Sequence, residues 1–254
     1  MCDIFALSAG INYTAQQYLP IFAEKGKRNM NGWGIGFYRD NQALVEKSAE
    51  RVYDSDQVHE SFQRLARVVD SRIIVSHISC PMSGGCHTAQ NHPFSLSFLN
   101  HVWLFVHIGL IKGIHDYQTT NKPKIDVDVY PARVFEYLRD QLISYLLYTP
   151  YDSLGRSLVK SIRSLLSDYP GYYSFVLANE SVLFVFSNFR TLMLLKESER
   201  YGNSLVLTTI GEGLSDKEWI AVEPEVNTLG KFLVVAGPDV LYLGNVTQEE
   251  EGLL

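Results

Sequence analysis

The residue with the clearest chemical potential in this chain is Cys2, directly after the initiator methionine. Removal of Met1 would make Cys2 the N-terminal residue, which would then carry both a thiol and a free α-amine. A thiol reacts as its thiolate and needs a nearby base or a lowered pKa. An α-amine titrates at about pH 8 and is able to serve as that base. The alternative is that Cys2 is an ordinary buried residue of the apolar run Met1–Leu7.

Three other segments place polar residues and glycines beside strand-like runs. Glycine permits the close approach of a second backbone, while histidine and serine supply hydrogen-bonding groups. Each segment alone is weak evidence for a function, and only their occurrence together in this order is informative. The segments are Arg28–Tyr38, which contains Asn31-Gly32-Trp33-Gly34-Ile35-Gly36-Phe37-Tyr38, then Ser76–Ser79 continuing to Gln90–Phe94, and Phe105–Ile111.

The stretch from residue 77 to residue 92 offers metal binding as an alternative chemistry. It contains imidazole and thiol groups, which zinc prefers in tetrahedral sites. The spacing matches no recognised zinc motif, and the chain has no C-x-x-C pair, so we expect no metal and no cofactor. The two cysteines of this stretch could instead form a disulfide or remain thiols, which the sequence leaves open. The candidate ligands are His77, Cys80, Cys86, His87 and His92.

The composition of the 254 residues fits an enzyme without specifying one. Hydrophobic residues make up 46% and charged residues 20%, as in globular proteins, and we expect a single domain over residues 1–254. The net charge of −6 argues against nucleic acid or an anionic membrane as a partner. The three cysteines, and the absence of a membrane-length apolar run and of a signal peptide, indicate a cytoplasmic protein.

The reactive segments fall on or beside expected strands. Apolar and period-two runs predict strands at 2–9, 33–38, 42–47, 72–77 and 103–107. Apolar residues at helical spacing predict a helix after Ser55, its expected N-cap, and two helices at 132–148 and 154–167. Further strands are expected at 174–178, 182–187, 191–195, 204–209, 219–222 and 232–235. This order predicts an α+β fold with two antiparallel sheets face to face and helices outside.

Together with Cys2, these segments resemble the class II glutamine amidotransferase-like family of N-terminal nucleophile hydrolases. Residues Asn31–Tyr38 are similar to the family's D-G-W-G-I-x-F-Y segment, and Asn91–Phe94 to its T-H-P-F segment. Phe105–Gly109 resembles the family strand that ends in H-N-G. Later segments at 205–209 and 213–219 extend the resemblance over nearly the whole chain, and it is closest to the small stand-alone members.

The resemblance implies a four-layer αββα sandwich, the N-terminal nucleophile hydrolase fold. It also implies that the Cys2 thiolate attacks a side-chain amide to give a thioester and ammonia, followed by hydrolysis. Gly109 aligns with a glycine whose N–H forms part of the oxyanion hole, and Arg28 with an arginine that some members place near the thiol. The expected substrate-binding set is Arg28, Gly34, His77, Ser79, His92 and Ile108.

Two positions depart from the family pattern where the substrate is expected. The asparagine of H-N-G, an oxyanion donor, is Ile108 here, and an isoleucine side chain has no donor. The arginine of the family's H-x-R motif, which binds the α-carboxylate of glutamine, is Ser79, which lacks its charge and bidentate geometry. The family aspartate that pairs with the substrate amine has Asp126 and Asp128 as nearest candidates, although the alignment favours Tyr130.

Two functions remain open from the sequence. In the first, the protein is an amidohydrolase that uses Cys2 to cleave a carboxamide or γ-glutamyl amide, with free glutamine disfavoured by the two departures. In the second, it is a catalytically degenerate family member that acts as a binding or regulatory subunit. The expected partner is a small-molecule amide, and the sequence does not specify a partner subunit or a homo-oligomer.

Overall fold

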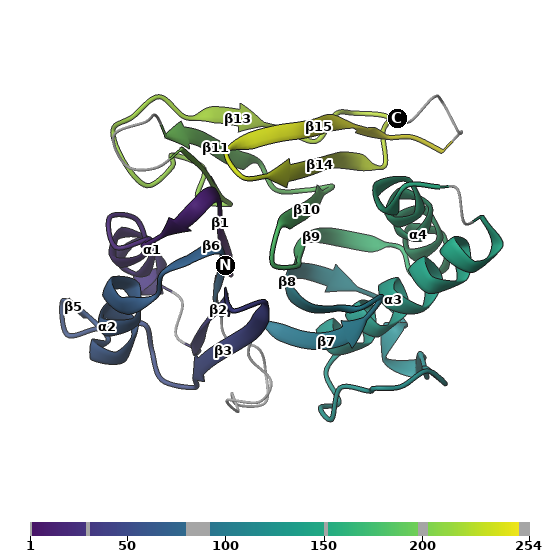
Figure 1. The fold of residues 1–254 in the computed structure, drawn as a ribbon, viewed down its shortest axis with the longest axis horizontal. Coiled ribbons are helices and arrows are strands. Elements are labelled where there is room, and N and C mark those ends of the chain that lie inside the picture. The colour runs from purple at the N-terminus through teal and green to yellow at the C-terminus, as the bar shows by residue number, and fades with distance from the viewer. Residues whose placement is uncertain (1, 29–30, 80–91, 150–151, 198–202, 249–254) are drawn as a thin grey trace.

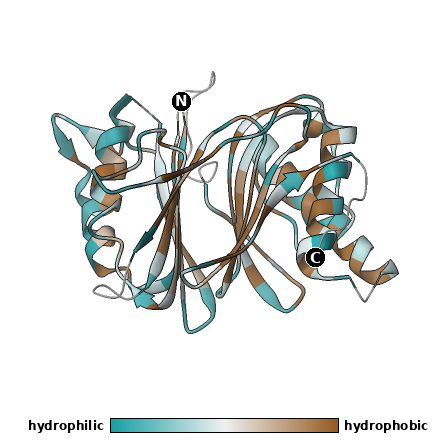
Figure 2. Cartoon of the chain, turned by 90° about the horizontal axis from the view of Figure 1, so that it is seen from above, coloured by the Kyte–Doolittle hydropathy of each residue, from teal (hydrophilic) through white to brown (hydrophobic). Residues whose placement is uncertain are grey.

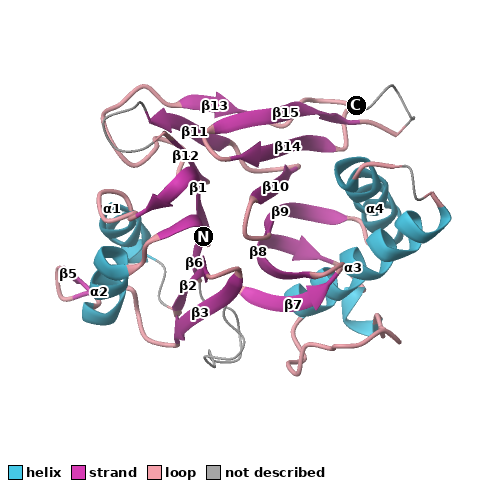
Figure 3. Cartoon of the chain, in the orientation of Figure 1, coloured by secondary structure: helices cyan, strands magenta, loops and turns pink. Residues whose placement is uncertain are grey.

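The computed structural model describes residues 2–28, 31–79, 92–149, 152–197 and 203–248. It contains two large antiparallel sheets that face each other, with helices on both outer faces (Figure 1, Figure 3). This arrangement confirms the αββα sandwich expected from the sequence. Within the described ranges, no helix has the length and apolar character needed to cross a membrane.

The first sheet has seven strands and places β1 in an interior position. β1 is hydrogen-bonded to β12 on one side and to β6 on the other, and its first half is almost entirely buried. A strand covered on both faces has a nearly continuous apolar sequence, as β1 does. In spatial order the strands are β13 (Ile220–Val222), β11 (Leu192–Glu197), β12 (Ser204–Thr208), β1 (Asp3–Tyr13), β6 (Ser71–Ile78), β2 (Trp33–Arg39) and β3 (Gln42–Ser48).

The second sheet has six strands, and β8 and β9 lie next to each other inside it. A separate two-stranded hairpin consists of β4 (Tyr53–Asp54) and β5 (Gln57–Val58). In spatial order the strands of the second sheet are β15 (Asp239–Val246), β14 (Gly230–Ala236), β10 (Val182–Ser187), β9 (Gly171–Ala178), β8 (His101–Ile111) and β7 (Phe94–Phe98).

Three apolar clusters hold the four layers together. One lies between the first sheet and its helices, one between the second sheet and its helices, and one between the two sheets. Figure 2 shows the sheets side by side with the helices at the two outer sides. The helices are α1 (Leu19–Lys25) and α2 (Glu60–Val68) on the first sheet, and α3 (Tyr130–Tyr148) and α4 (Leu154–Asp168) on the second.

Helix α2 begins later than its sequence pattern predicts. Ser55, the expected N-cap, lies instead in the turn between β4 and β5 with a φ of 50°. The cap is His59, whose Nδ1 accepts a hydrogen bond from the Ser61 N–H at 3.3 Å. The prediction of Ser55 was wrong because a ring nitrogen supplies the acceptor that a serine hydroxyl usually provides.

Besides the two-residue strands β4 and β5 and the 3-10 helices, the sequence did not predict α1, β7 and β15. In β7 the buried residues Phe94, Leu96 and Phe98 alternate with the exposed Ser95 and Ser97, a period-two pattern that is visible in the sequence. Helix α1 has only seven residues, so its helical period does not stand out. Strand β15 has an apolar run at 240–243 that could have indicated a strand, although most of the strand is exposed or half-buried at a sheet edge.

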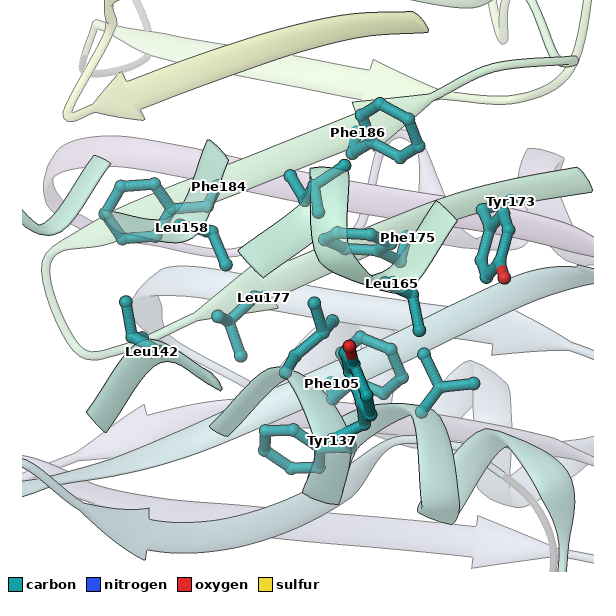
Figure 4. Packing of buried hydrophobic residues seen from close by; sticks show 14 of the residues in the cluster. Phe105, Tyr137, Leu142, Leu158, Leu165, Tyr173, Phe175, Leu177, Phe184 and Phe186 are labelled. Atoms are coloured by element: carbon teal, nitrogen blue, oxygen red, sulfur yellow. The ribbon is translucent and has the colours of Figure 1, made fainter. Parts of the chain in front are cut away.

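The cluster between the second sheet and its helices contains packed aromatic rings (Figure 4). Phe105 is fully buried, and its ring centroid lies 4.9 Å from that of Phe135 and 5.6 Å from that of Phe175. We expect Phe105→Ala to lower the free energy of unfolding by about 3–5 kcal/mol, because it removes apolar contacts and leaves a cavity. Leu147, which is 74% exposed, is the control site. Urea unfolding of Leu147→Ala should show a change below about 0.5 kcal/mol, and equal effects of the two substitutions would contradict this packing.

Candidate active site

Cys2 lies directly before β1. Its side chain is partly buried and packs against the apolar cluster between the two sheets. The register pairs Asp3 with Ile78 and Ile4 with His77, so Ser79 comes next to Cys2 directly after β6. The expected nucleophile and the residue that replaces the family arginine therefore lie at neighbouring strand ends.

Gly34 on β2 allows the segment at His92 to approach the first sheet. Gly34 pairs with His77 of β6, and a Cβ atom at Gly34 would lie 2.0 Å from the His92 carbonyl oxygen. Any other residue would collide with this backbone. The Ser79 N–H donates to the Gly32 carbonyl oxygen at 3.0 Å, which joins the end of β6 to the start of β2. The structure thus brings Gly34, His77, Ser79 and His92 together, and their roles toward a substrate stay predictions.

Gly109 on β8 has a backbone conformation that favours glycine. Its φ is +141°, and an added Cβ atom would lie 1.8 Å from the Tyr172 carbonyl oxygen. Tyr130, the first residue of α3, donates its hydroxyl to the Gly109 carbonyl oxygen at 2.9 Å. Asp126 and Asp128, the other candidates for the family aspartate position, are exposed. Of these three residues, Tyr130 is the one with a hydrogen bond to the Gly109 backbone.

Ile108, directly before Gly109, belongs to the same apolar cluster between the sheets as Cys2. It is 4% exposed, and its register partner is Ser174 of β9. Strands β1 and β6 both contact β8 across the interface between the sheets (Figure 1). The expected nucleophile and the expected oxyanion segment therefore come from different sheets and share one cluster.

Three histidine rings lie close together: His77 on β6, His92 before β7 and His107 on β8. The ring centroids of His77 and His92 are 4.4 Å apart, and those of His92 and His107 are 6.3 Å apart. All three residues are buried, and each has a ring nitrogen without a hydrogen-bond partner among the described residues. Burial lowers the pKa of His77 and of His107 to about 3, and it also lowers the pKa of His92. The three imidazoles are therefore neutral at neutral pH.

The sequence also raised the question of a metal site at residues 77–92. In the part of the chain that the structure describes, no group of histidine, cysteine, aspartate or glutamate side chains is arranged to hold a metal ion. Three of the candidate ligands, Cys80, Cys86 and His87, lie outside the described residues.

Two basic residues in or beside the site segments, Arg28 and Lys47, differ in how far they are exposed to solvent. Arg28, the expected arginine near the thiol, is exposed at the end of a short 3-10 helix, η1 (Gly26–Arg28). Lys47 on β3 pairs in register with Gly34, and its Nζ lies 4.7 Å from the centroid of the Phe94 ring. Burial lowers the pKa of Lys47 to about 8. The sequence analysis did not select Lys47, because a lysine in a strand pattern normally indicates an exposed position.

Arg190 is the residue near Cys2 that the sequence analysis missed. Its guanidinium donates to the Cys2 carbonyl oxygen at 3.4 Å and to Asp3 Oδ1 at 2.9 Å. Arg190 is 188 residues away from Cys2 in the chain and lies in a turn, so no local pattern connects the two. The one available signal was Asp3, an acidic residue within an apolar strand.

We predict that the histidine cluster makes stability fall with acid. The folded chain resists protonation of His77, His92 and His107, so below the ordinary histidine pKa of about 6.5 the unfolded chain binds more protons. The stabilisation is complete above that pH, and at pH 5.5 each histidine should have lost on the order of 1 kcal/mol. Urea unfolding at pH 7.5 and 5.5 measures the loss, and His107→Phe, which removes one titrating ring, should make it smaller. Equal free energies of unfolding at the two pH values would contradict the prediction.

Both the sequence and the fold of this chain are similar to those of glutamine amidotransferases. The family model described as glutamine amidotransferases class-II matches residues 1–207. The structure is similar to that of a predicted glutamine amidotransferase from Pseudomonas aeruginosa, with a TM-score of 0.62, 17% identity and coverage of 95% of this chain and 100% of that one. A glutamine aminotransferase class-II domain protein from Silicibacter pomeroyi is similar with a TM-score of 0.56, 14% identity and coverage of 96% and 99%.

The structure is also similar to glutamine PRPP amidotransferase from B. subtilis, with a TM-score of 0.66 and 13% identity. The match covers 98% of this chain and 50% of that enzyme, so this chain spans about half of it. At these identities the structural likeness shows the fold alone, and the sequence matches none of the curated proteins. Because the family model covers most of the sequence, the chain belongs to the class II glutamine amidotransferase family and has the N-terminal nucleophile hydrolase fold.

Proposed function

We propose that this protein is an amidohydrolase that uses Cys2, after removal of Met1, to cleave a carboxamide or a γ-glutamyl amide through a thioester. Membership of the family supports amide hydrolysis as the class of chemistry. The departures from the family pattern at Ser79 and Ile108 make free glutamine an unfavourable substrate. No metal or cofactor takes part in the proposed reaction. We place it in the reducing cytoplasm, where a free thiol nucleophile persists.

The observation that supports this function most is the placement of Cys2. A chain end is usually poorly ordered unless it is tied to the fold. Cys2 instead directly precedes an interior strand that is hydrogen-bonded on both sides, and it packs in the same cluster as Ile108 of the opposite sheet. A fixed nucleophile beside a fixed acceptor segment is what a near-attack geometry requires.

In the proposed reaction the Cys2 α-amine accepts the thiol proton, and the thiolate forms a bond to the amide carbon. Backbone N–H groups of the segment Ile108–Gly109 stabilise the negative oxygen of the tetrahedral intermediate. The C–N bond then breaks, and the leaving amine takes the proton from the α-ammonium group. Water, deprotonated by the same α-amine, attacks the thioester, which releases a carboxylic acid and restores the thiol.

The surroundings of the site favour a neutral group in the substrate next to the nucleophile. His77 and His92 are uncharged at neutral pH, and Ser79 beside Cys2 offers a hydroxyl where the family has a cation. Neutral imidazole and hydroxyl groups are able to donate or accept hydrogen bonds to an amide, but they do not neutralise a carboxylate. We therefore expect weak binding of the α-carboxylate of glutamine.

One observation favours a second function, that of a catalytically degenerate binding or regulatory subunit. The Ile108 side chain is buried in an apolar cluster and offers no donor at the place of the family asparagine. Loss of one oxyanion donor typically costs about 10²–10³ in rate. This alternative predicts an intact fold with no reaction at Cys2.

Covalent labelling distinguishes the two functions. We expect a diazoketone analogue of glutamine to add one label per chain at Cys2 in protein that begins with Cys2, as verified by intact mass. Cys2→Ala should take up no label, because it lacks the nucleophile. Absence of labelling in correctly processed wild-type protein, even at a reagent concentration high enough to offset weak binding of the α-carboxylate, would contradict the enzyme function and favour the degenerate subunit.

Ser79→Arg tests the assignment of substrate preference. A restored guanidinium beside Cys2 should lower KM for γ-glutamyl substrates with a free α-carboxylate by about 10-fold or more, since a charge-assisted hydrogen bond is worth about 1.5–3 kcal/mol. Ser79→Gln adds length without charge and serves as the matched control. Steady-state kinetics on a substrate whose α-carboxylate is amidated should show no gain for either variant. The same gain on both substrates would show that position 79 does not read the carboxylate.

A further inference from the structure

The turn between β10 and β11 contacts the start of β1. The Arg190 guanidinium in this turn donates to the Cys2 carbonyl oxygen at 3.4 Å through one terminal nitrogen. Through the other it donates to Asp3 Oδ1 at 2.9 Å and to the Thr209 carbonyl oxygen at 2.6 Å. The side chains of Arg190 and Asp3 are 16% and 13% exposed, so this ion pair is shielded from water. A guanidinium is planar and donates in fixed directions, so it suits these three acceptors better than an ammonium group would.

Thr209 completes the enclosure of the first residues of β1. Its hydroxyl accepts from the Ile4 N–H at 2.9 Å and donates to Asp3 Oδ1 at 3.2 Å. Thr209 is 1% exposed, so its hydroxyl has little access to competing water. Cys2, Asp3 and Ile4 are thus each held by a group from the C-terminal half of the chain.

The opposite side of the same turn contacts the strands of the second sheet. The Ser187 hydroxyl donates to the Arg190 carbonyl oxygen at 2.6 Å and forms a hydrogen bond with the Ser174 hydroxyl at 2.7 Å. Ser174 on β9 is the register partner of Ile108 on β8. Both serines are almost fully buried. Hydrogen bonds of Ser174 and Ser187, together with the Arg190 residue itself, therefore link the strand pair of Ile108 to the carbonyl group of Cys2.

A second contact of the turn reaches Tyr172, whose backbone lies against Gly109. The Phe189 ring centroid lies 6.0 Å from that of Tyr172. The Tyr172 carbonyl oxygen occupies the space that a Cβ atom of Gly109 would need, 1.8 Å away. The turn 187–190 therefore contacts the neighbours of both expected halves of the site, one from each sheet.

We infer that Arg190 is a positioning residue, which fixes Cys2 relative to the backbone of Ile108–Gly109 through the turn 187–190. The inference rests on the proposed function and adds to it the residue that sets the attack distance. Removal of the guanidinium would leave the buried Asp3 carboxylate without this ion pair and release the Cys2 carbonyl group. Displacement of a nucleophile by about 1 Å is able to lower a rate by about 10²-fold.

The test compares two reagents on the same thiol. A diazoketone analogue of glutamine needs both the nucleophile and the segment Ile108–Gly109, whereas iodoacetamide needs only an accessible Cys2 thiol. In Arg190→Ala we expect diazoketone labelling of Cys2 to slow by about 10–100-fold while iodoacetamide labelling changes by less than about 3-fold. Arg190→Lys, which keeps the charge without the planar geometry, should fall between wild type and Arg190→Ala.

A matched control removes a different cation–carboxylate pair. Lys196 on β11 pairs with Asp239 at 2.7 Å, and both side chains are largely exposed. Lys196→Ala should leave both labelling rates unchanged. If Arg190→Ala unfolds, which a large rise in iodoacetamide labelling would reveal, Ser187→Ala is measured instead, because it keeps the guanidinium but removes the link to Ser174. It should slow diazoketone labelling by about 10-fold.

Equal diazoketone rates in wild type and in the variants at Arg190 would overturn the inference and leave the proposed function standing. A parallel loss of both labelling rates would also overturn it, because the guanidinium would then act on the thiol itself and not on its position. If wild-type protein that begins with Cys2 takes up no diazoketone label, the proposed function fails and this inference fails with it.

Discussion

The expected site depends on one constraint, that the second residue of the chain is held as firmly as a residue in the middle of a sheet. The hydrogen bonds of β1 to β6 and β12 meet this constraint along the strand. At its first residues, Thr208 adds a hydroxyl hydrogen bond to the Ile4 carbonyl oxygen at 3.0 Å, and Arg190 binds the Cys2 carbonyl oxygen. Fraying, which is usual at a chain end, is opposed here by groups more than 180 residues away in sequence.

A second constraint is the close approach of backbones at Gly34 and at Gly109. Gly34 admits the His92 carbonyl group, and Gly109 admits that of Tyr172. Gly34 brings the segment before β7 of the second sheet close to β2 of the first, and Gly109 brings β9 close to β8 within the second sheet. The apolar cluster between the sheets then joins Cys2 to Ile108. The expected site residues thus lie close together in the fold, and we expect Ser79 and Ile108 to change the groups offered to a substrate.

The sequence predicted the features whose requirements are local. Buried strands such as β1 have apolar runs, helices α3 and α4 have a helical period, and Gly34 and Gly109 stand in recognisable motifs. Interactions between distant segments were not predictable in this way. Arg190 lies in a turn, and Lys47 lies in a strand whose sequence pattern indicates an exposed position. The contacts of both residues are made with segments that are distant in the chain. The His59 cap shows the same limit at short range, because its ring nitrogen replaces the expected hydroxyl.

The central claim is that Cys2 is an N-terminal nucleophile that forms a thioester. Acid-quench mass spectrometry of the protein mixed with a γ-glutamyl amide tests it most directly. We predict a native chain that lacks Met1 and carries a γ-glutamyl adduct on Cys2, which disappears on treatment with hydroxylamine and is absent from Cys2→Ala. A native chain that retains Met1, or a processed chain that releases product without any adduct on Cys2, would contradict the account.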